Sequence, residues 1–194
     1  MLQYSTGTRQ QLPPQLFEQM GYYRREVFIN RLGWELNTTN GMELDEFDGP
    51  DAVYVCSHDD DGNVNGVARL LPTTAPYLME KVFPELWGGK QLPRDPRIWE
   101  LSRFAAASHN PNGSSTHQAS AKHASELLCN VMRAGSMLGA DALVTVSPVG
   151  MERLLRLNGF RAVRSGTSII NHNIPIVALS IDCVECLSTD SGSS

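Results

Sequence analysis

Two apolar runs separated by a tight acidic turn constrain the fold more than any other part of this sequence. Residues 52–57 and 64–71 are rich in apolar and β-branched side chains, and the turn between them, residues 59–63, has the sequence DDDGN. An Asp-Gly turn between two such runs predicts a β-hairpin. The acidic run lacks the spacing and the closing glutamate of an EF-hand loop, so we interpret it as a solvated turn and not as a calcium site.

The rest of the chain alternates between helical and strand patterns. Apolar residues at helical spacing begin after Pro13 and Pro14 and end at Gly33. A polar loop follows at residues 36–49, and a second long helix is predicted between a cap at Ser114 or Ser115 and a stop at Gly139. Short helices are predicted at 78–86 and 149–157, and strands at 97–107, 142–147 and 174–183. Strands, helices and a hairpin in this order predict an α/β protein with three α-β-α layers and a mixed sheet.

Length and composition indicate a cytoplasmic protein of one domain. The 194 residues suit a single domain at 1–187, followed by a polar tail at 188–194 that we expect to be disordered. No run approaches the roughly 18 apolar residues of a membrane span, and the polar start does not resemble a signal peptide. Cys183 and Cys186 form a Cys-x-x-Cys pair without a second pair, so we expect reduced thiols and not a zinc or redox site.

Charge is distributed unevenly. The net charge of −5 argues against a nucleic-acid partner. Four arginines nevertheless fall close together near the end of the chain, at Arg153, Arg156, Arg161 and Arg164. This basic cluster is either a docking surface for an acidic partner or a solvated helix face, and composition alone favours neither.

Charged residues also interrupt predicted strands. Arg69 lies in one strand, and Glu100 and Arg103 lie in another. Buried charge is costly unless it is paired, so these residues either tie the 36–49 loop to the sheet through its aspartates or take part in chemistry. No phosphate loop, dinucleotide-binding glycine motif, His-Glu-x-x-His zinc motif or serine-hydrolase elbow is present, and we predict no metal site.

Charged and aromatic positions recur in a fixed order along the chain: YRREVF at 23–28, Trp34, Asp45, Asp48, RLLPTT at 69–74, Phe83, WELSRF at 99–104, VTVS at 144–147 and MERLLR at 151–156. Up to about residue 183, their order and spacing resemble those of LuxI-type acyl-homoserine-lactone synthases.

This resemblance implies an N-acetyltransferase-like fold with a twisted mixed sheet, and an acyltransferase that makes a quorum-sensing autoinducer. The implied substrates are S-adenosylmethionine, which is consumed and is no cofactor, and a fatty acyl group on acyl carrier protein. Acetyltransferases of this fold hold the coenzyme A pyrophosphate in a glycine-rich turn. Residues 107–114, ASHNPNGS, do not match that turn, which favours the carrier protein. The alternatives are another N-acyltransferase that uses acyl-coenzyme A and a non-enzymatic acyl-binding module.

Roles for individual residues follow from the resemblance together with their chemistry. Glu100 is our first choice for the general base. Arg69 and Arg103 would orient the substrate carboxylate, while Asp45 and Asp48 complement the sulfonium and amine or hold the arginines. Trp34 is either a core residue or a platform for the adenine. The S-adenosylmethionine site would thus comprise Arg24, Phe28, Trp34, Arg69, Arg103 and Phe104.

The acyl chain and the carrier protein need further surfaces. Acyl-pocket candidates, which also fit an ordinary core, are Leu101, Ser102, Val144, Thr145, Val146, Met151 and Leu155. The region of Thr145 is associated in this family with acceptance of a 3-oxo group, although its β-propensity alone explains a threonine there. The basic cluster at Arg153, Arg156, Arg161 and Arg164 would bind the acidic carrier protein.

Overall fold

The computed structural model describes residues 2–107 and 117–183. The chain divides into two compact units. The first unit comprises residues 1–71 and 103–130, and the second comprises residues 72–102 and 131–194. A single domain over 1–187 remains a prediction.

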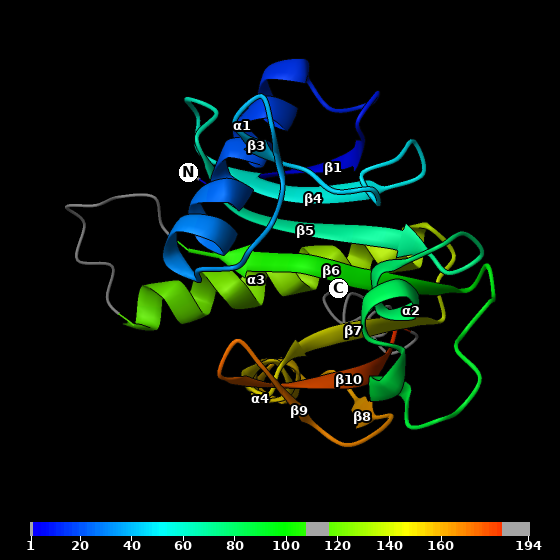
Figure 1. Ribbon diagram of the computed structural model, residues 1–194. Coiled ribbons are helices and arrows are strands. Elements are labelled where there is room, and N and C mark those ends of the chain that lie inside the picture. Colours follow the sequence, from blue (N-terminus) through cyan, green and yellow to red (C-terminus); the bar gives the residue numbers. More distant parts are fainter. Residues whose placement is uncertain (1, 108–116, 184–194) are drawn as a thin grey trace. The chain divides into compact units, whose positions relative to one another are not determined.

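The first unit contains an antiparallel sheet with the strand order β1 (Gln3–Thr8), β4 (Val53–His58) and β5 (Val64–Pro72) (Figure 1). The 59–63 turn joins β4 to β5, which confirms the predicted hairpin. On one face, Tyr54 of β4 meets Phe17 of α1 (Pro14–Arg24) edge to face, with ring centroids 5.5 Å apart. On the other face, Ser57 of β4 lies 2.8 Å from a ring nitrogen of His123 in α3 (His117–Met137). Tyr54 and Ser57 are three residues apart in β4, so they point to opposite faces of this sheet and contact a helix on each.

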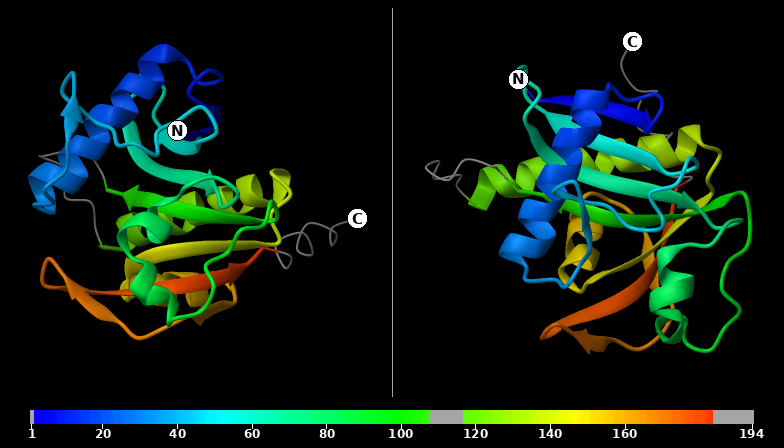
Figure 2. Two further views of the ribbon diagram at one scale, coloured as in Figure 1. Left: turned by 45° about the vertical axis from the view of Figure 1, so that its right-hand side comes forward. Right: turned by 45° about the horizontal axis from the view of Figure 1, so that its top comes forward.

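The second unit contains a mixed sheet. Here residues 98–101 of β6 (Ile98–Ala106), a strand that continues into the first unit, pair in parallel with β7 (Ala142–Pro148). β7 in turn pairs antiparallel with β10 (Ile174–Asp182), as the left view of Figure 2 shows. Two short strands, β8 (Ala162–Arg164) and β9 (Ile169–Asn171), also pair with β10. The helical segments are α2 (Leu78–Val82), the 3-10 turn η2 (Pro84–Trp87) and α4 (Gly150–Leu157). The predicted α/β fold with a mixed sheet is confirmed.

Several details differ from the sequence-based expectation. The N-terminal helix does not stay α-helical to its end, because residues Arg25–Arg31 form the π-helix η1 before Gly33, at φ +70°, ends the segment. The 36–49 loop contains a hairpin of two-residue strands, β2 (Thr38–Thr39) and β3 (Met42–Glu43). Strands β1, β8 and β9 were not predicted from the sequence. The predicted cap at Ser114 or Ser115, Cys186 and the 188–194 tail lie outside the described residues.

Within the described ranges, no helix is long and apolar enough to cross a membrane.

Candidate functional site

Arg24, the last residue of α1, is fully buried and bonds to two carboxylates of the 36–49 loop. Its Nε donates to Glu43 Oε2 at 2.6 Å, and its Nη1 and Nη2 donate to Asp48 Oδ1 and Oδ2 at 2.7 and 3.0 Å. A close contact between α1 and β3 brings these groups together. A Cβ atom on Gly21 would lie only 2.7 Å from the Cβ of Met42, so glycine is needed where β3 meets the helix.

Arg69 of β5 and Arg103 of β6 complete the same group. Arg69 Nη1 donates to Asp45 Oδ1 at 2.5 Å and lies 3.0 Å from Asp48 Oδ1. Arg103 Nη2 donates to Glu43 Oε1 at 3.0 Å and to Asp45 Oδ2 at 2.8 Å. The backbone of Arg103 is left-handed, at φ +53°, within a strand. Such a conformation is unfavourable for a side chain of this kind and is often found at functional sites.

Ion pairs connect six residues in a group of balanced charge, which we call the charged cluster: Arg24, Glu43, Asp45, Asp48, Arg69 and Arg103. Three guanidiniums face three carboxylates, which offsets the desolvation of each charge. Most of the cluster is closed to solvent. Its accessible edge is formed by Asp45, whose side chain is 20% exposed, while the side chains of Arg103 and Asp48 are each 5% exposed.

Burial and ion pairing act in opposite directions on the pKa values of Asp48, Glu43 and Arg24. Burial alone would raise the pKa of the Asp48 carboxyl, but Arg24 and Arg69 hold it well below its ordinary value. Burial likewise opposes ionisation of Glu43, and Arg24 and Arg103 together lower its pKa. Burial also opposes the charge on Arg24, yet Asp48 and Glu43 raise its pKa. Each charge therefore depends on its partners.

Aromatic rings border the cluster. Phe28 and Trp34 stack with centroids 5.1 Å apart and planes inclined by 20°, and the guanidinium carbon of Arg103 lies 5.6 Å from the centroid of Phe28. Phe28 is buried, whereas Trp34 is partly exposed. The structure thus brings together Arg24, Phe28, Trp34, Asp45, Asp48, Arg69 and Arg103 of the predicted site. Phe104 follows Arg103 and is half-buried.

Sequence reasoning missed Glu43, which bridges Arg24 and Arg103 and is fully buried. Its only signal was its place in the acidic loop, two residues before Asp45. Tyr54 was also missed, and its hydroxyl donates to Asp48 Oδ1 at 2.9 Å. Burial, reinforced by Asp48, raises the pKa of Tyr54 far above its ordinary value, so this hydroxyl remains protonated and acts as a donor.

Glu100 belongs to the second unit and is fully buried. Its Oε2 accepts a hydrogen bond from the backbone N–H of Leu78 at 2.8 Å, and its Oε1 accepts one from Met79 at 2.6 Å. Both oxygens are thus bonded to backbone amides at the start of α2. These two hydrogen bonds fix the position of the carboxylate and give Glu100 a structural role.

The predicted acyl-pocket residues of the second unit divide between two faces of its sheet. Leu101 lies beside Thr145, and Glu100 lies beside Val144, in the β6–β7 pairing. Because neighbouring residues of a strand point to opposite faces, Leu101 and Thr145 share one face, and Val144 and Val146 share the other. Thr145 is buried, with its hydroxyl oxygen 2.8 Å from that of Ser147. Leu101, Ser102, Met151 and Leu155 are buried too.

The predicted basic cluster is only partly available to a partner. Arg164 pairs with Glu152, its Nε lying 2.6 Å from Oε1, and Arg161 lies 3.8 Å from Asp182. Arg153 and Arg156 of α4 are exposed, and neither forms an ion pair with another side chain in the described ranges. Leu157, beside them on α4, is 70% exposed.

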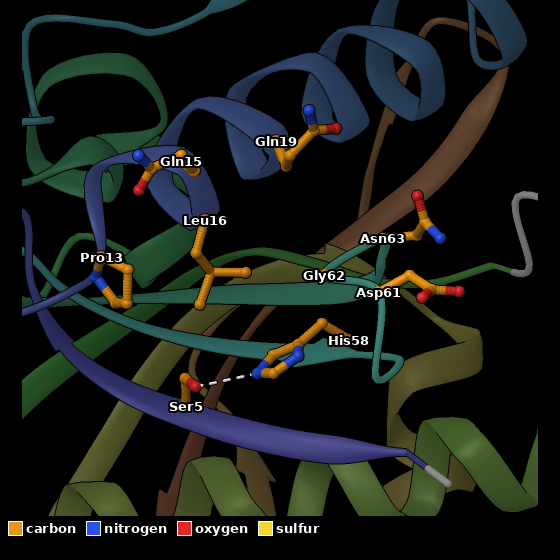
Figure 3. A pocket seen from close by; sticks show the side chains of 9 residues that line it. All are labelled: Ser5, Pro13, Gln15, Leu16, Gln19, His58, Asp61, Gly62 and Asn63. Carbon is orange, nitrogen blue, oxygen red and sulfur yellow. Dashed lines mark hydrogen bonds between the residues drawn. The ribbon is translucent and has the colours of Figure 1, made fainter.

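A surface recess of about 380 Å³ lies elsewhere in the first unit (Figure 3). The His58 ring within it is already bonded, because Nε2 lies 2.9 Å from Ser5 Oγ and Nδ1 lies 3.0 Å from the backbone oxygen of Asp59. None of the lining residues belongs to the charged cluster, so we assign this recess no substrate. They are Ser5, Pro13, Gln15, Leu16, Gln19, His58, Asp61, Gly62 and Asn63.

Known proteins resemble this chain over most of its length. A sequence profile described as autoinducer synthase matches residues 10–188. A protein of Acinetobacter nosocomialis named acyl-homoserine-lactone synthase is 44% identical over 168 residues, which cover 86% of this chain and 92% of that protein.

Solved structures agree with this result. TofI, in a ternary complex with an inhibitor and MTA, has a TM-score of 0.80 and 36% identity, covering 93% of this chain and 91% of TofI. BjaI, described as a CoA-dependent acyl-homoserine lactone synthase with SAM and isopentyl-CoA, has a TM-score of 0.81 and 26% identity, covering 94% and 84%. An acyl-CoA N-acyltransferase from Pseudomonas aeruginosa, at 16% identity and a TM-score of 0.58, shares the fold alone, as the N-acetyltransferase-like prediction requires.

Proposed function

The chain belongs to the autoinducer synthase family of acyl-homoserine-lactone synthases, and we propose that it transfers a fatty acyl group from acyl carrier protein to S-adenosylmethionine and releases an N-acyl-L-homoserine lactone. The complexes of TofI with MTA and of BjaI with SAM support S-adenosylmethionine as the amine substrate. We propose no resident cofactor or metal, because the sulfonium of S-adenosylmethionine already provides a good leaving group. The cytoplasm, where both substrates are made, is the proposed compartment.

The charged cluster is the observation that carries this proposal. S-adenosylmethionine presents a sulfonium, an amine and a carboxylate, so its site must offer both signs of charge. The accessible edge of the cluster offers both, in Asp45 and Arg103. Asp45 suits the sulfonium or the amine, and Arg103 suits the carboxylate. Trp34, stacked on Phe28, provides an aromatic face for the adenine ring.

In the first step, the amine nitrogen of S-adenosylmethionine attacks the thioester carbonyl carbon. The N–C bond forms, the C–S bond of the thioester breaks, and the carrier leaves as a thiol. The amine must lose a proton, and we assign its removal to Glu100, directly or through a water molecule. The two backbone hydrogen bonds hold the Glu100 carboxylate in a fixed position.

In the second step, a carboxylate oxygen of the same methionyl unit attacks its own γ-carbon. The ring C–O bond forms, the bond from the γ-carbon to sulfur breaks, and methylthioadenosine leaves with the bonding electrons. The enzyme mainly needs to hold the carboxylate in line with the departing sulfur. Arg103 fits this role better than Arg69, because the Arg69 side chain is fully buried while that of Arg103 reaches the accessible edge.

The acyl chain needs an apolar surface beside the general base, and Val144 and Val146 share one face of the second unit's sheet with Glu100. We propose this face for the acyl chain, and Val146 on it is partly exposed. The opposite face, which carries Leu101 and Thr145, is assigned to the ordinary core. The hydroxyl pair of Thr145 and Ser147 lies on that opposite face, so we assign it no contact with a 3-oxo group.

Acyl carrier protein is the proposed donor because α4 presents two exposed arginines beside an exposed leucine. Arg153, Arg156 and Leu157 together match an acidic partner with an apolar contact. Arg161 and Arg164, which pair with acidic side chains of this chain, are the weaker candidates. Since BjaI is described as CoA-dependent, the donor is the part of the proposal that most needs a direct test.

The test is mass spectrometry of the purified chain with S-adenosylmethionine and a panel of acyl groups, each supplied on carrier protein and on coenzyme A. We expect methylthioadenosine and one acyl-homoserine lactone in equal amounts, with the carrier-bound donor preferred. Faster turnover with coenzyme A thioesters would replace the donor assignment. An acylated amine without methylthioadenosine would indicate an ordinary N-acyltransferase, and no turnover with any donor would indicate a binding module.

A further inference from the structure

One buried hydroxyl is bonded to the backbones of two strands that supply arginines to the charged cluster. Tyr23 is the next-to-last residue of α1 and is only 3% exposed. Its hydroxyl lies 2.8 Å from the backbone oxygen of Asn65 and 3.0 Å from that of Ala107, and it accepts a hydrogen bond from the N–H of Ala107 at 2.8 Å. The phenol therefore uses both its donor and its acceptor capacity.

The two residues that bond to the Tyr23 hydroxyl lie close in sequence to arginines of the charged cluster. Asn65 lies in β5, four residues before Arg69. Ala107 directly follows β6 and comes four residues after Arg103. Tyr23 itself precedes Arg24. The hydroxyl thus joins the three elements that carry the guanidiniums of the charged cluster, each within one to four residues of its arginine.

Arg103 is the member that most needs such a restraint. Its φ of +53° interrupts the regular geometry of β6, so local strand pairing alone does not fix where its side chain points. Arg103 also forms the accessible edge of the cluster with Asp45. A small displacement of this backbone would change the part of the cluster that meets a ligand.

We propose that Tyr23 is a positioning residue for S-adenosylmethionine, which sets the Arg103 edge of the charged cluster by tying α1 to β5 and to the end of β6. This inference rests on the proposed function. Tyr23 need not touch the substrate, because it acts through the backbone that carries Arg103. Burial raises the pKa of the Tyr23 phenol to about 12, which keeps the hydroxyl protonated and able to donate across the working pH range.

The test is Tyr23→Phe, which removes the hydroxyl and keeps the buried ring. We expect the KM for S-adenosylmethionine to rise about tenfold, with the KM for the acyl donor unchanged and kcat within about twofold of wild type. Tyr22→Phe is the matched control, because Tyr22 is the neighbouring residue on α1 and is 44% exposed. That control should keep wild-type constants.

The outcomes separate this inference from the proposed function. If wild-type protein forms no lactone, the proposed function fails. If wild-type protein turns over and folded Tyr23→Phe has an unchanged KM for S-adenosylmethionine with only a lower melting temperature, the inference is overturned and Tyr23 is a stability anchor. Should Tyr23→Phe not fold, 4-aminophenylalanine at position 23 takes its place, because its amine still donates but accepts poorly. A KM raised about threefold supports the inference, and an unchanged KM overturns it.

Discussion

Arg24 and Asp48 form a two-pronged pair, with two guanidinium nitrogens 2.7 and 3.0 Å from the two carboxylate oxygens. Both side chains are almost completely closed to solvent, at 0% and 5% exposure. Paired geometry of this kind is specific to arginine, because a lysine ammonium cannot present two parallel donors to one carboxylate. The pair anchors the acidic loop to α1, and Asp45 belongs to the same loop.

Replacing Arg24 should therefore affect stability as well as binding. Arg24→Met removes the charge and leaves Glu43 and Asp48 buried with fewer partners, which costs roughly 3–5 kcal/mol. Arg24→Lys keeps the positive charge but cannot donate two parallel hydrogen bonds to Asp48, so we expect a smaller loss of stability. The free energy of unfolding in urea measures both. Arg25→Lys is a suitable control because Arg25 is exposed. Equal stability of Arg24→Met and wild type would contradict the anchoring role.

The lowered pKa values of Asp48 and Glu43 also predict acid sensitivity. The pKa values of Asp48 and Glu43 are lowered from ordinary values of 3.8 and 4.5 in spite of burial, because guanidiniums face them. A lowered pKa in the folded state stabilises the fold above the ordinary value, and that stabilisation is lost as the pH falls through and below it. We expect the free energy of unfolding to decline as the pH is lowered from about 5 to 3. Asp48→Asn should be less stable at pH 7 but should show a shallower decline, and equal slopes would count against this assignment.

Part of the site was predictable because buried charge must be paired. A charged residue in an apolar strand is conspicuous in the sequence, and pairing of Arg69 and Arg103 with the loop aspartates was one of the two roles considered for them. Glu43 gave no such signal, since a glutamate in an acidic loop has the same appearance whether it is solvated or buried. Only the close contact of β3 with Gly21 of α1 places it beside Arg24.

The secondary structure, like the site, could be predicted from the sequence only in part. Long apolar runs predicted β4, β5, β6, β7 and β10, whereas β1 has the polar sequence QYSTGT and is a strand because it pairs with β4. The π-helix η1 was not predictable, because apolar spacing over seven residues does not separate it from an α-helix. The left-handed backbone of Arg103 likewise has no sequence signal, although it directs a cluster side chain.

Glu100 carries two roles that one substitution can separate. If Glu100 is the general base, Glu100→Gln should lower kcat at least ~100-fold. Glu100 also anchors the start of α2, because the backbone N–H groups of Leu78 and Met79 both donate to its carboxylate. Glutamine offers only one acceptor oxygen, so we expect Glu100→Gln to lose some thermal stability whether or not Glu100 is the base. Glu85→Gln, an exposed carboxylate in η2, is the control. A folded Glu100→Gln enzyme with near-normal kcat and a lower melting temperature would leave Glu100 only its structural role.

If Arg153 and Arg156 bind the carrier protein, their replacement should affect only donors that are carried on the acidic protein. Reversing both exposed arginines, as Arg153→Glu with Arg156→Glu, should raise the KM for acyl carrier protein thioesters about tenfold and weaken the salt dependence of that KM, because rim charges act mainly on encounter. The KM for the same acyl group on pantetheine should not change, because pantetheine is uncharged. Arg133→Glu, at an exposed position of α3 in the same unit, is the control for net charge. A KM for the carrier thioester that stays at the wild-type value, or one that rises equally for the pantetheine thioester, would remove Arg153 and Arg156 from the docking surface.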